Sequence, residues 1–257
     1  MLLAIPLGLA IGLIVGSVGG GGAILALPVL VYVLGEAPGP ASTAALVVVA
    51  VAAALGAGAL AIRGHVCWRL ALTFSLPAAA GSALGAIANA QVSGRALILG
   101  FVPVMLVAAV ATWRRAYVAR EERDDGCPHP PLPAILAAGF GVGALTGFFG
   151  VGGGFMIVPV LTLLFDAGFH RAVATSLVII TLTGLAALGS HLAAGATLDV
   201  RLTLALAAPT GLGAVAGTIV GRRLPQAVLG RTFALLVAVV AGLLFVDVVA
   251  LGGPPGA

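Results

Sequence analysis

Long apolar runs, separated by short polar or turn-rich segments, dominate this chain. They extend over residues 2–34, 41–62, 70–90, 96–113, 134–165, 172–194, 202–220 and 228–251. A helix needs about twenty apolar residues to cross the hydrocarbon core of a bilayer, and the runs are of that length or longer. The pattern therefore predicts an all-α polytopic membrane protein.

The two longest runs each contain a block of glycines near the middle. The first block is GSVGGGGAILALP, residues 16–28, and the second is GFFGVGGGFMIVP, residues 147–159. Glycine weakens a helix interior, so a plain spanning helix gains nothing from such a block. Each block is therefore interpreted as an unwound turn that joins two half-helices.

Backbone N–H groups are the chemistry that such turns offer. Glycine permits positive φ and close approach, so several N–H groups can converge on one point. The half-helices that follow would direct the positive ends of their dipoles toward the same point. Irregular backbone at membrane depth survives where it lines a cavity, which is typical of a midplane anion site. The candidate substrate-binding glycines are Gly19, Gly20, Gly21, Gly22, Gly150, Gly152, Gly153 and Gly154.

The glycine blocks belong to an internal duplication. An offset of 131 residues aligns the region around Gly16 to Pro28 with the region around Gly147 to Pro159. The sequence therefore predicts a first transmembrane repeat over 1–113, a charged, proline-rich linker over 114–133 and a second repeat over 134–257.

The arginines bear on the orientation of the two repeats. If each glycine segment spans the membrane, the halves are parallel and the arginines divide seven against five between the two sides. If each segment is a re-entrant hairpin followed by three crossings, the halves are inverted and the division is ten against two. The positive-inside rule favours the inverted arrangement, with both termini outside the cytoplasm.

Composition supports the membrane assignment and restricts the function. The chain is 61% hydrophobic and 8% charged, and its mean hydropathy is +1.23. The net charge of +4 comes from arginines that flank apolar runs, which is typical of membrane spans rather than of nucleic-acid binding. The two cysteines, Cys67 and Cys127, are too few for a disulfide framework and lack metal-ligand spacing. The first residues lack the basic segment of a cleaved signal peptide, so we expect them to be retained.

Hydroxyl side chains follow each glycine segment. Thr43 lies in ASTAAL, and Thr175 and Ser176 lie in the matching AVATSL. Hydroxyls near a helix start can bind an oxyanion without placing a charge in the membrane, although ordinary N-capping is an alternative role. His191 is an ionisable residue within an apolar run, which makes it a candidate for proton or substrate coupling.

The residue pattern does not support enzyme catalysis or metal binding. Ser190 and His191 are adjacent, so on a helix they point about 100° apart and cannot form a nucleophile–base pair. No G-x-S-x-G or H-E-x-x-H motif occurs, and neither glycine block carries the lysine of a phosphate-binding loop. The histidines are scattered along the chain. We therefore expect no enzyme activity, no cofactor and no metal site.

The pattern G-x-x-G-x-G-G-x-x-x-x-x-P occurs twice, at Gly16 to Pro28 and at Gly147 to Pro159. The segment A-x-x-T-S-L lies at Ala172 to Leu177, with a weaker copy at Ala41 to Leu46. Together these motifs resemble the TauE/SafE family of sulfite exporters. The likeness covers nearly the whole chain. It implies a secondary transporter of the bacterial cytoplasmic membrane that moves small sulfur-containing anions, such as sulfite, sulfonates or thiosulfate, usually outward.

The resemblance also points to the glycine turns and to Thr43, Thr175 and Ser176 as site residues. The first half departs from the pattern, because Ala44 and Ala45 stand where the second half has Thr175 and Ser176. Two alternatives remain open at this stage: an anion channel, and a membrane scaffold or assembly factor without a substrate. The anion, the coupling ion and the oligomeric state are not determined by the sequence.

Overall fold

The computed structural model describes residues 4–20, 23–36, 38–89, 92, 94–118, 126–149, 154–193, 195 and 199–250. All regular elements in these ranges are helices. In chain order they are α1 (Ala4–Val18), α2 (Ala23–Pro28), the π-helical η2 (Val29–Val33), α3 (Pro38–Ala61), α4 (Trp68–Asn89), α5 (Gly94–Val118), α6 (Leu132–Phe149), α7 (Gly154–Leu163), α8 (Phe169–Ala193), α9 (Val200–Arg223) and α10 (Gln226–Ala250).

Seven of the described helices are long and apolar enough to cross a membrane, namely α3, α4, α5, α6, α8, α9 and α10. Large apolar side chains such as Leu76, Val107 and Leu212 are exposed on their outer faces, as expected for contact with lipid rather than with water. The prediction of an all-α polytopic membrane protein is confirmed.

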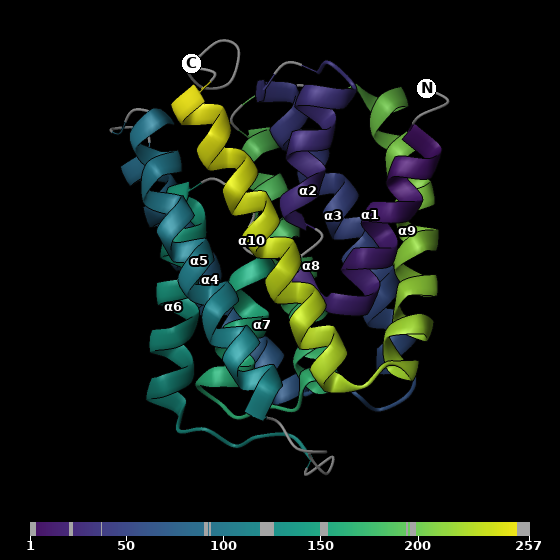
Figure 1. Ribbon diagram of the computed structural model, residues 1–257, viewed down its shortest axis with the longest axis vertical. Coiled ribbons are helices and arrows are strands. Elements are labelled where there is room, and N and C mark those ends of the chain that lie inside the picture. Colours follow the sequence, from purple (N-terminus) through teal and green to yellow (C-terminus); the bar gives the residue numbers. More distant parts are fainter. Residues whose placement is uncertain are drawn as a thin grey trace.

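Two α-helices are described in each of the glycine-rich runs. In the first run α1 ends at Val18 and α2 begins at Ala23, and in the second run α6 ends at Phe149 and α7 begins at Gly154. Figure 1 shows that α1 enters from the end of the molecule that holds both termini, and that α2 leads back to that same end. Helix α6 enters from the opposite end, to which α7 returns. The two hairpins therefore enter the molecule from opposite ends.

The first helix of each hairpin packs against a helix of the other half. Helix α1 runs beside α9, and α6 runs beside α4. A β-carbon at Gly16 of α1 would lie 1.9 Å from the carbonyl oxygen of Ala214 in α9, and one at Gly143 of α6 would lie 2.0 Å from that of Ala78 in α4. Only glycine allows backbones to approach this closely, so helices that are distant in sequence interlock in two pairs, α1 with α9 and α4 with α6.

Each interlocking pair also contains an internal proline. Pro77 lies within α4 and Pro209 within α9. The ring of Pro209 lies against Gly8 of α1, and the ring of Pro77 lies against Gly139 of α6. Each proline ring thus fills the space that a glycine leaves open on the partner helix.

Basic residues gather at the end of the molecule opposite the termini, where the linker residues 126–131 also lie (Figure 1). This end holds the turn between α3 and α4, the end of α5, the start of α8 and the turn between α9 and α10. These segments include Arg63, Arg69, Arg114, Arg115, Arg171, Arg222, Arg223 and Arg231. Arg95 and Arg201 begin helices at the other end, and Arg120 and Arg123 lie outside the described residues.

Candidate functional site

The described ends of the two glycine segments meet inside the molecule. Gly19 follows α1 with a positive φ of 80°, a conformation that favours glycine. A β-carbon at Gly20 would lie 1.6 Å from the carbonyl oxygen of Gly154, the first residue of α7. The backbones of the two segments are therefore in direct contact. The other candidate glycines, Gly21, Gly22, Gly150, Gly152 and Gly153, lie outside the described residues.

Helix α8 passes beside this contact. The hydroxyl oxygen of Ser176 is 2.9 Å from the position that a β-carbon of Gly19 would occupy, and Ile180, near the middle of α8, approaches Gly154. Ser176 is fully buried, and its hydroxyl donates to the carbonyl oxygen of Val173 at 2.8 Å. A hydroxyl hydrogen can rotate about the Cβ–O bond, so this group can be redirected toward an anion at the glycine contact.

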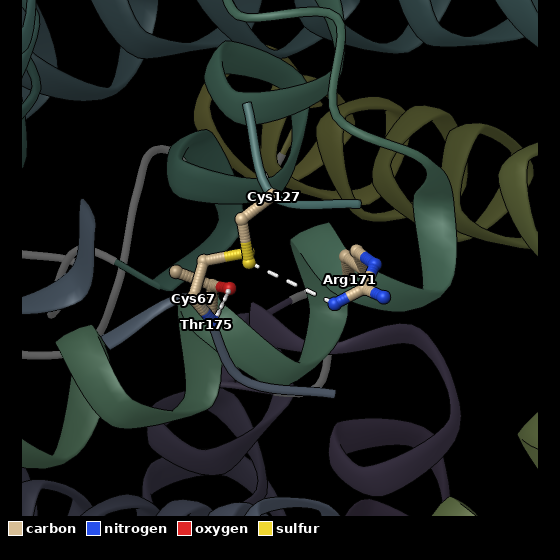
Figure 2. Close-up of a disulfide and its surroundings, with 4 residues drawn as sticks. All are labelled: Cys67, Cys127, Arg171 and Thr175. Carbon is tan, nitrogen blue, oxygen red and sulfur yellow. Dashed lines mark hydrogen bonds between the residues drawn. A yellow bond between two sulfur atoms is a disulfide. The ribbon is translucent and has the colours of Figure 1, made fainter. Parts of the chain in front are cut away.

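Thr175 makes a different contact from its neighbour. Its side-chain oxygen accepts a hydrogen bond from the backbone N–H of Cys67, 3.2 Å away, between α3 and α4. Cys67 forms a disulfide with Cys127 of the linker, as Figure 2 shows. This disulfide was not predicted from the sequence, because two cysteines 60 residues apart carry no pairing signal of their own. Thr175 therefore joins α8 to the disulfide-linked segment at the arginine-rich end of the molecule.

Thr43 and His191 form a pair of their own. The Thr43 hydroxyl, which is fully buried, lies 3.2 Å from Nδ1 of His191. Thr43 is in the first turns of α3 and His191 is in the last turn of α8. Along α8, His191 and Thr175 are roughly sixteen residues, or about 24 Å, apart. The structure therefore brings Ser176 to the glycine contact but does not bring Thr43 and Thr175 to one small anion.

Two histidines that are far apart in sequence line a single narrow cleft below the first glycine segment. His65 precedes α4 and His170 begins α8, and both line the cleft together with Arg222 of α9. Gly16 and Ser17 of α1 form another part of its wall. In the sequence these two histidines look unrelated. The packing of α3, α8 and α9 brings them together, and packing between distant helices leaves no local sequence pattern.

No group of three or more histidine, cysteine, aspartate or glutamate side chains in the described part of the chain is arranged to hold a metal ion. The side-chain donor beside the glycine contact is the Ser176 hydroxyl, and the N-terminus of α7 begins there at Gly154. These groups suit an oxyanion, because they donate hydrogen bonds without carrying a charge into the membrane.

Comparison with known proteins identifies relatives over most of the chain. The family model described as "Sulfite exporter TauE/SafE" matches residues 4–244. A "Probable membrane transporter protein" of Xylella fastidiosa is 34% identical over 252 residues, covering 94% of this chain and 93% of the relative. The "Probable membrane transporter protein YunE" of Bacillus subtilis is 30% identical over 173 residues, covering 62% of this chain and 63% of the relative. No solved structure matches the chain.

Proposed function

Because the chain belongs to the sulfite exporter TauE/SafE family and is a multi-pass membrane transporter, not an enzyme, we propose that it exports small sulfur-containing anions across a bacterial cytoplasmic membrane. The proposed substrates are sulfite, sulfonates and thiosulfate. Bacterial relatives and the concentration of arginines at one end of the molecule support this location and orientation.

The contact between Gly20 and Gly154 is the observation that carries the proposed substrate site. It joins two interrupted helices inside a transporter, and it has a buried hydroxyl, that of Ser176, beside it. Gly154 begins the ten-residue helix α7, so the positive end of that helix dipole lies at the contact. The substrate anion binds here to backbone N–H groups and to the Ser176 hydroxyl.

The packing of the helices suggests how the site is exposed to each side in turn. Close backbone contacts make α1 with α9, and α4 with α6, two rigid pairs that each contain helices from both halves. Inverted repeats commonly exchange two orientations around a fixed central site. The inverted-repeat arrangement, supported by hairpins that enter from opposite ends, lets these pairs rock against α3 and α8.

A thermal-unfolding scan of the purified protein tests the substrate class. The scan compares sulfite, thiosulfate, sulfate, taurine, sulfoacetate and chloride at matched ionic strength. A ligand that binds only the folded state stabilises it by about 2.7 kcal/mol at a hundredfold excess over Kd. We expect stabilisation by one sulfur anion and not by chloride.

Ser176→Ala and Ser190→Ala make a matched pair for the same assay. Both hydroxyls donate to a carbonyl three residues earlier on α8, but Ser176 is buried at the glycine contact and Ser190 is exposed. Hydrogen bonds to charged groups contribute about 1.5–3 kcal/mol, so we expect Ser176→Ala to raise the Kd for the anion roughly tenfold to a hundredfold. Ser190→Ala should leave it unchanged. Equal Kd values in the two variants would remove Ser176 from the site.

The Thr43–His191 pair is proposed to couple transport to proton movement, since His191 is an ionisable side chain within a membrane-spanning helix and its Nδ1 lies against the Thr43 hydroxyl. In proteoliposomes with an imposed pH gradient, we expect His191→Asn to lower anion flux at least tenfold, and Thr43→Val to do the same. Because the two side chains act through one contact, the double variant should be no worse than either single variant. Additive losses, or full dependence on the pH gradient in His191→Asn, would contradict the assignment.

A further inference from the structure

The disulfide lies in a cleft at the arginine-rich end of the molecule. It ties the segment between α3 and α4 to the segment that leads into α6. The cleft has a volume of about 110 Å³, and both sulfur-bearing residues line it. Arg69 and His129 contribute to the same wall. The disulfide is thus reachable from the aqueous end of the protein by a molecule of a few heavy atoms.

Among the described residues, the charged side chains next to the disulfide are the arginines Arg69 and Arg171. Arg69 and His129 line the cleft, and Nη1 of Arg171 lies 3.7 Å from the sulfur of Cys127 (Figure 2). None of the described residues that line the cleft is acidic. Opposite charges raise the local concentration of an anion in a recessed site. The cleft therefore favours an anionic reagent over a neutral or cationic one.

We propose that this cleft admits sulfite, which opens the Cys67–Cys127 disulfide by nucleophilic attack; the identity of the nucleophile rests on the function proposed above. The lone pair on the sulfite sulfur forms a new S–S bond to one cysteine. The bond between the two cysteine sulfurs breaks, and its electron pair leaves on the other cysteine as a thiolate. The products are an S-sulfonated cysteine and a free thiolate, so no further oxidant or reductant is needed.

The position of Arg171 selects the leaving sulfur. A thiolate leaves faster when a nearby cation stabilises its charge. Arg171 contacts the sulfur of Cys127, so Cys127 leaves as the thiolate and Cys67 receives the sulfonate. Only 4% of the surface of Cys67 is exposed. Cys67 lines the cleft together with Arg69, so a reagent would reach Cys67 through the cleft.

Opening the disulfide has a direct connection to the proposed substrate site. The backbone N–H of Cys67 donates to Thr175, whose neighbour on α8 is Ser176. Cleavage releases the linker from this segment and leaves a negative group on Cys67. The disulfide therefore acts as a sensor through which the transported anion loosens the arginine-rich end of its own transporter, and reversal occurs when the thiolate displaces sulfite.

The test uses the purified full-length protein in detergent, without other reductants. After exposure to sulfite, free thiols are labelled with a maleimide and the cysteines are mapped by peptide mass spectrometry. We expect sulfonate on Cys67 and maleimide on Cys127. Mercaptoethanesulfonate, an anionic thiol, should open the disulfide faster than cysteamine, a cationic thiol, after correction for their rates with a small reference disulfide.

The variants Arg69→Gln and Arg63→Gln distinguish the effect of a charge in the cleft from the effect of the total charge at this end of the protein. Both arginines flank the turn between α3 and α4, but Arg69 lines the cleft and Arg63 is not among the residues that line it. Charges near a protein surface interact by about 1 kcal/mol or more, so we expect Arg69→Gln to slow sulfite cleavage about fivefold and Arg63→Gln to leave it unchanged. Added salt should reduce the difference between Arg69→Gln and the parent.

Two outcomes would overturn the proposal: an intact disulfide under conditions in which sulfite cleaves the reference disulfide, or equal rates with the anionic and cationic thiols. Sulfonate found on Cys127 would overturn the role given to Arg171. These results are independent of transport. If sulfite cleaves the disulfide but is neither bound at the glycine contact nor transported, the disulfide reaction stands and the proposed substrate fails. If sulfite is transported while the disulfide stays unreactive, the substrate stands and the sensor fails.

Discussion

Gly143→Ala is expected to destroy the folded protein, whereas Gly141→Ala, two residues earlier on the same helix, is expected to be tolerated. A β-carbon at Gly143 would lie 2.0 Å from the carbonyl oxygen of Ala78 and 2.7 Å from that residue's Cα. These are backbone atoms of α4, so no side-chain rotation relieves the overlap. At Gly141 no atom lies within 4 Å of the added methyl group.

The expected cost of Gly143→Ala follows from the packing of the two helices. Extra methylene groups in a well-packed interior typically cost 1–3 kcal/mol through side-chain and backbone shifts, and occasionally more. Here α6 and α4 must separate along their contact, where Gly147 also touches the backbone of Ser82. We therefore expect a loss of at least about 3 kcal/mol, which is a large part of the stability of an ordinary protein.

Size-exclusion chromatography and thermal unfolding in detergent would measure both variants beside the parent. Gly12→Ala provides a replicate in the equivalent pair, because its β-carbon would lie 2.0 Å from the carbonyl oxygen of Thr210. Gly141→Ala should match or slightly exceed the parent, since alanine favours a helix by about 1 kcal/mol over glycine. Parent-like unfolding of Gly143→Ala would show that α4 and α6 do not pack as described.

Gly20→Ala is expected to abolish transport. The added β-carbon would lie 1.6 Å from the carbonyl oxygen of Gly154 and 2.0 Å from its carbonyl carbon, so the two glycine segments must move apart. Catalytic and binding sites lose about a hundredfold in rate when groups shift by an ångström, and a similar loss is expected here. The reciprocal change is milder, because a β-carbon at Gly154 would have its nearest neighbour at 3.1 Å.

Proteoliposome flux of the preferred anion would measure Gly20→Ala and Gly154→Ala together. We expect at least a hundredfold loss in the first variant and a smaller loss in the second. An intact Cys67–Cys127 disulfide and parent-like elution would show that Gly20→Ala still folds. Parent-like flux in that variant would show that the glycine contact is not part of the transport pathway.

The hydrophobic pattern predicted much of the fold, because a helix that spans a membrane requires a long run of apolar residues. Residues 172–194 were expected to form one helix, and α8 spans Phe169–Ala193. The end of α1 at Val18, next to Gly19 with its positive φ, was also predictable, since glycine acts locally on the backbone. Ser176 was identified from its own motif and lies beside Gly19.

Contacts between distant helices were not predictable in the same way. Thr43 and His191 are 148 residues apart, and Cys67 and Cys127 are 60 residues apart. Such pairs depend on how helices rotate and cross, which the period of apolar residues does not specify within a membrane, where several faces are apolar. The matching segments ASTAAL and AVATSL suggested one site for Thr43 and Thr175, yet Thr43 of α3 contacts His191 in the last turn of α8, whereas Thr175 lies near the start of α8.

The interlocking of α1 with α9 also constrains how the protein is made. About 200 residues separate Gly12 from its partner Thr210, and at 5–20 residues per second a ribosome needs roughly ten to forty seconds to produce them. During that time α1 carries a glycine-lined face with no partner helix in place. The nascent first half must therefore be sheltered, by lipid or by the insertion machinery, until the second half emerges, and assembly is completed only after α9 has entered the membrane.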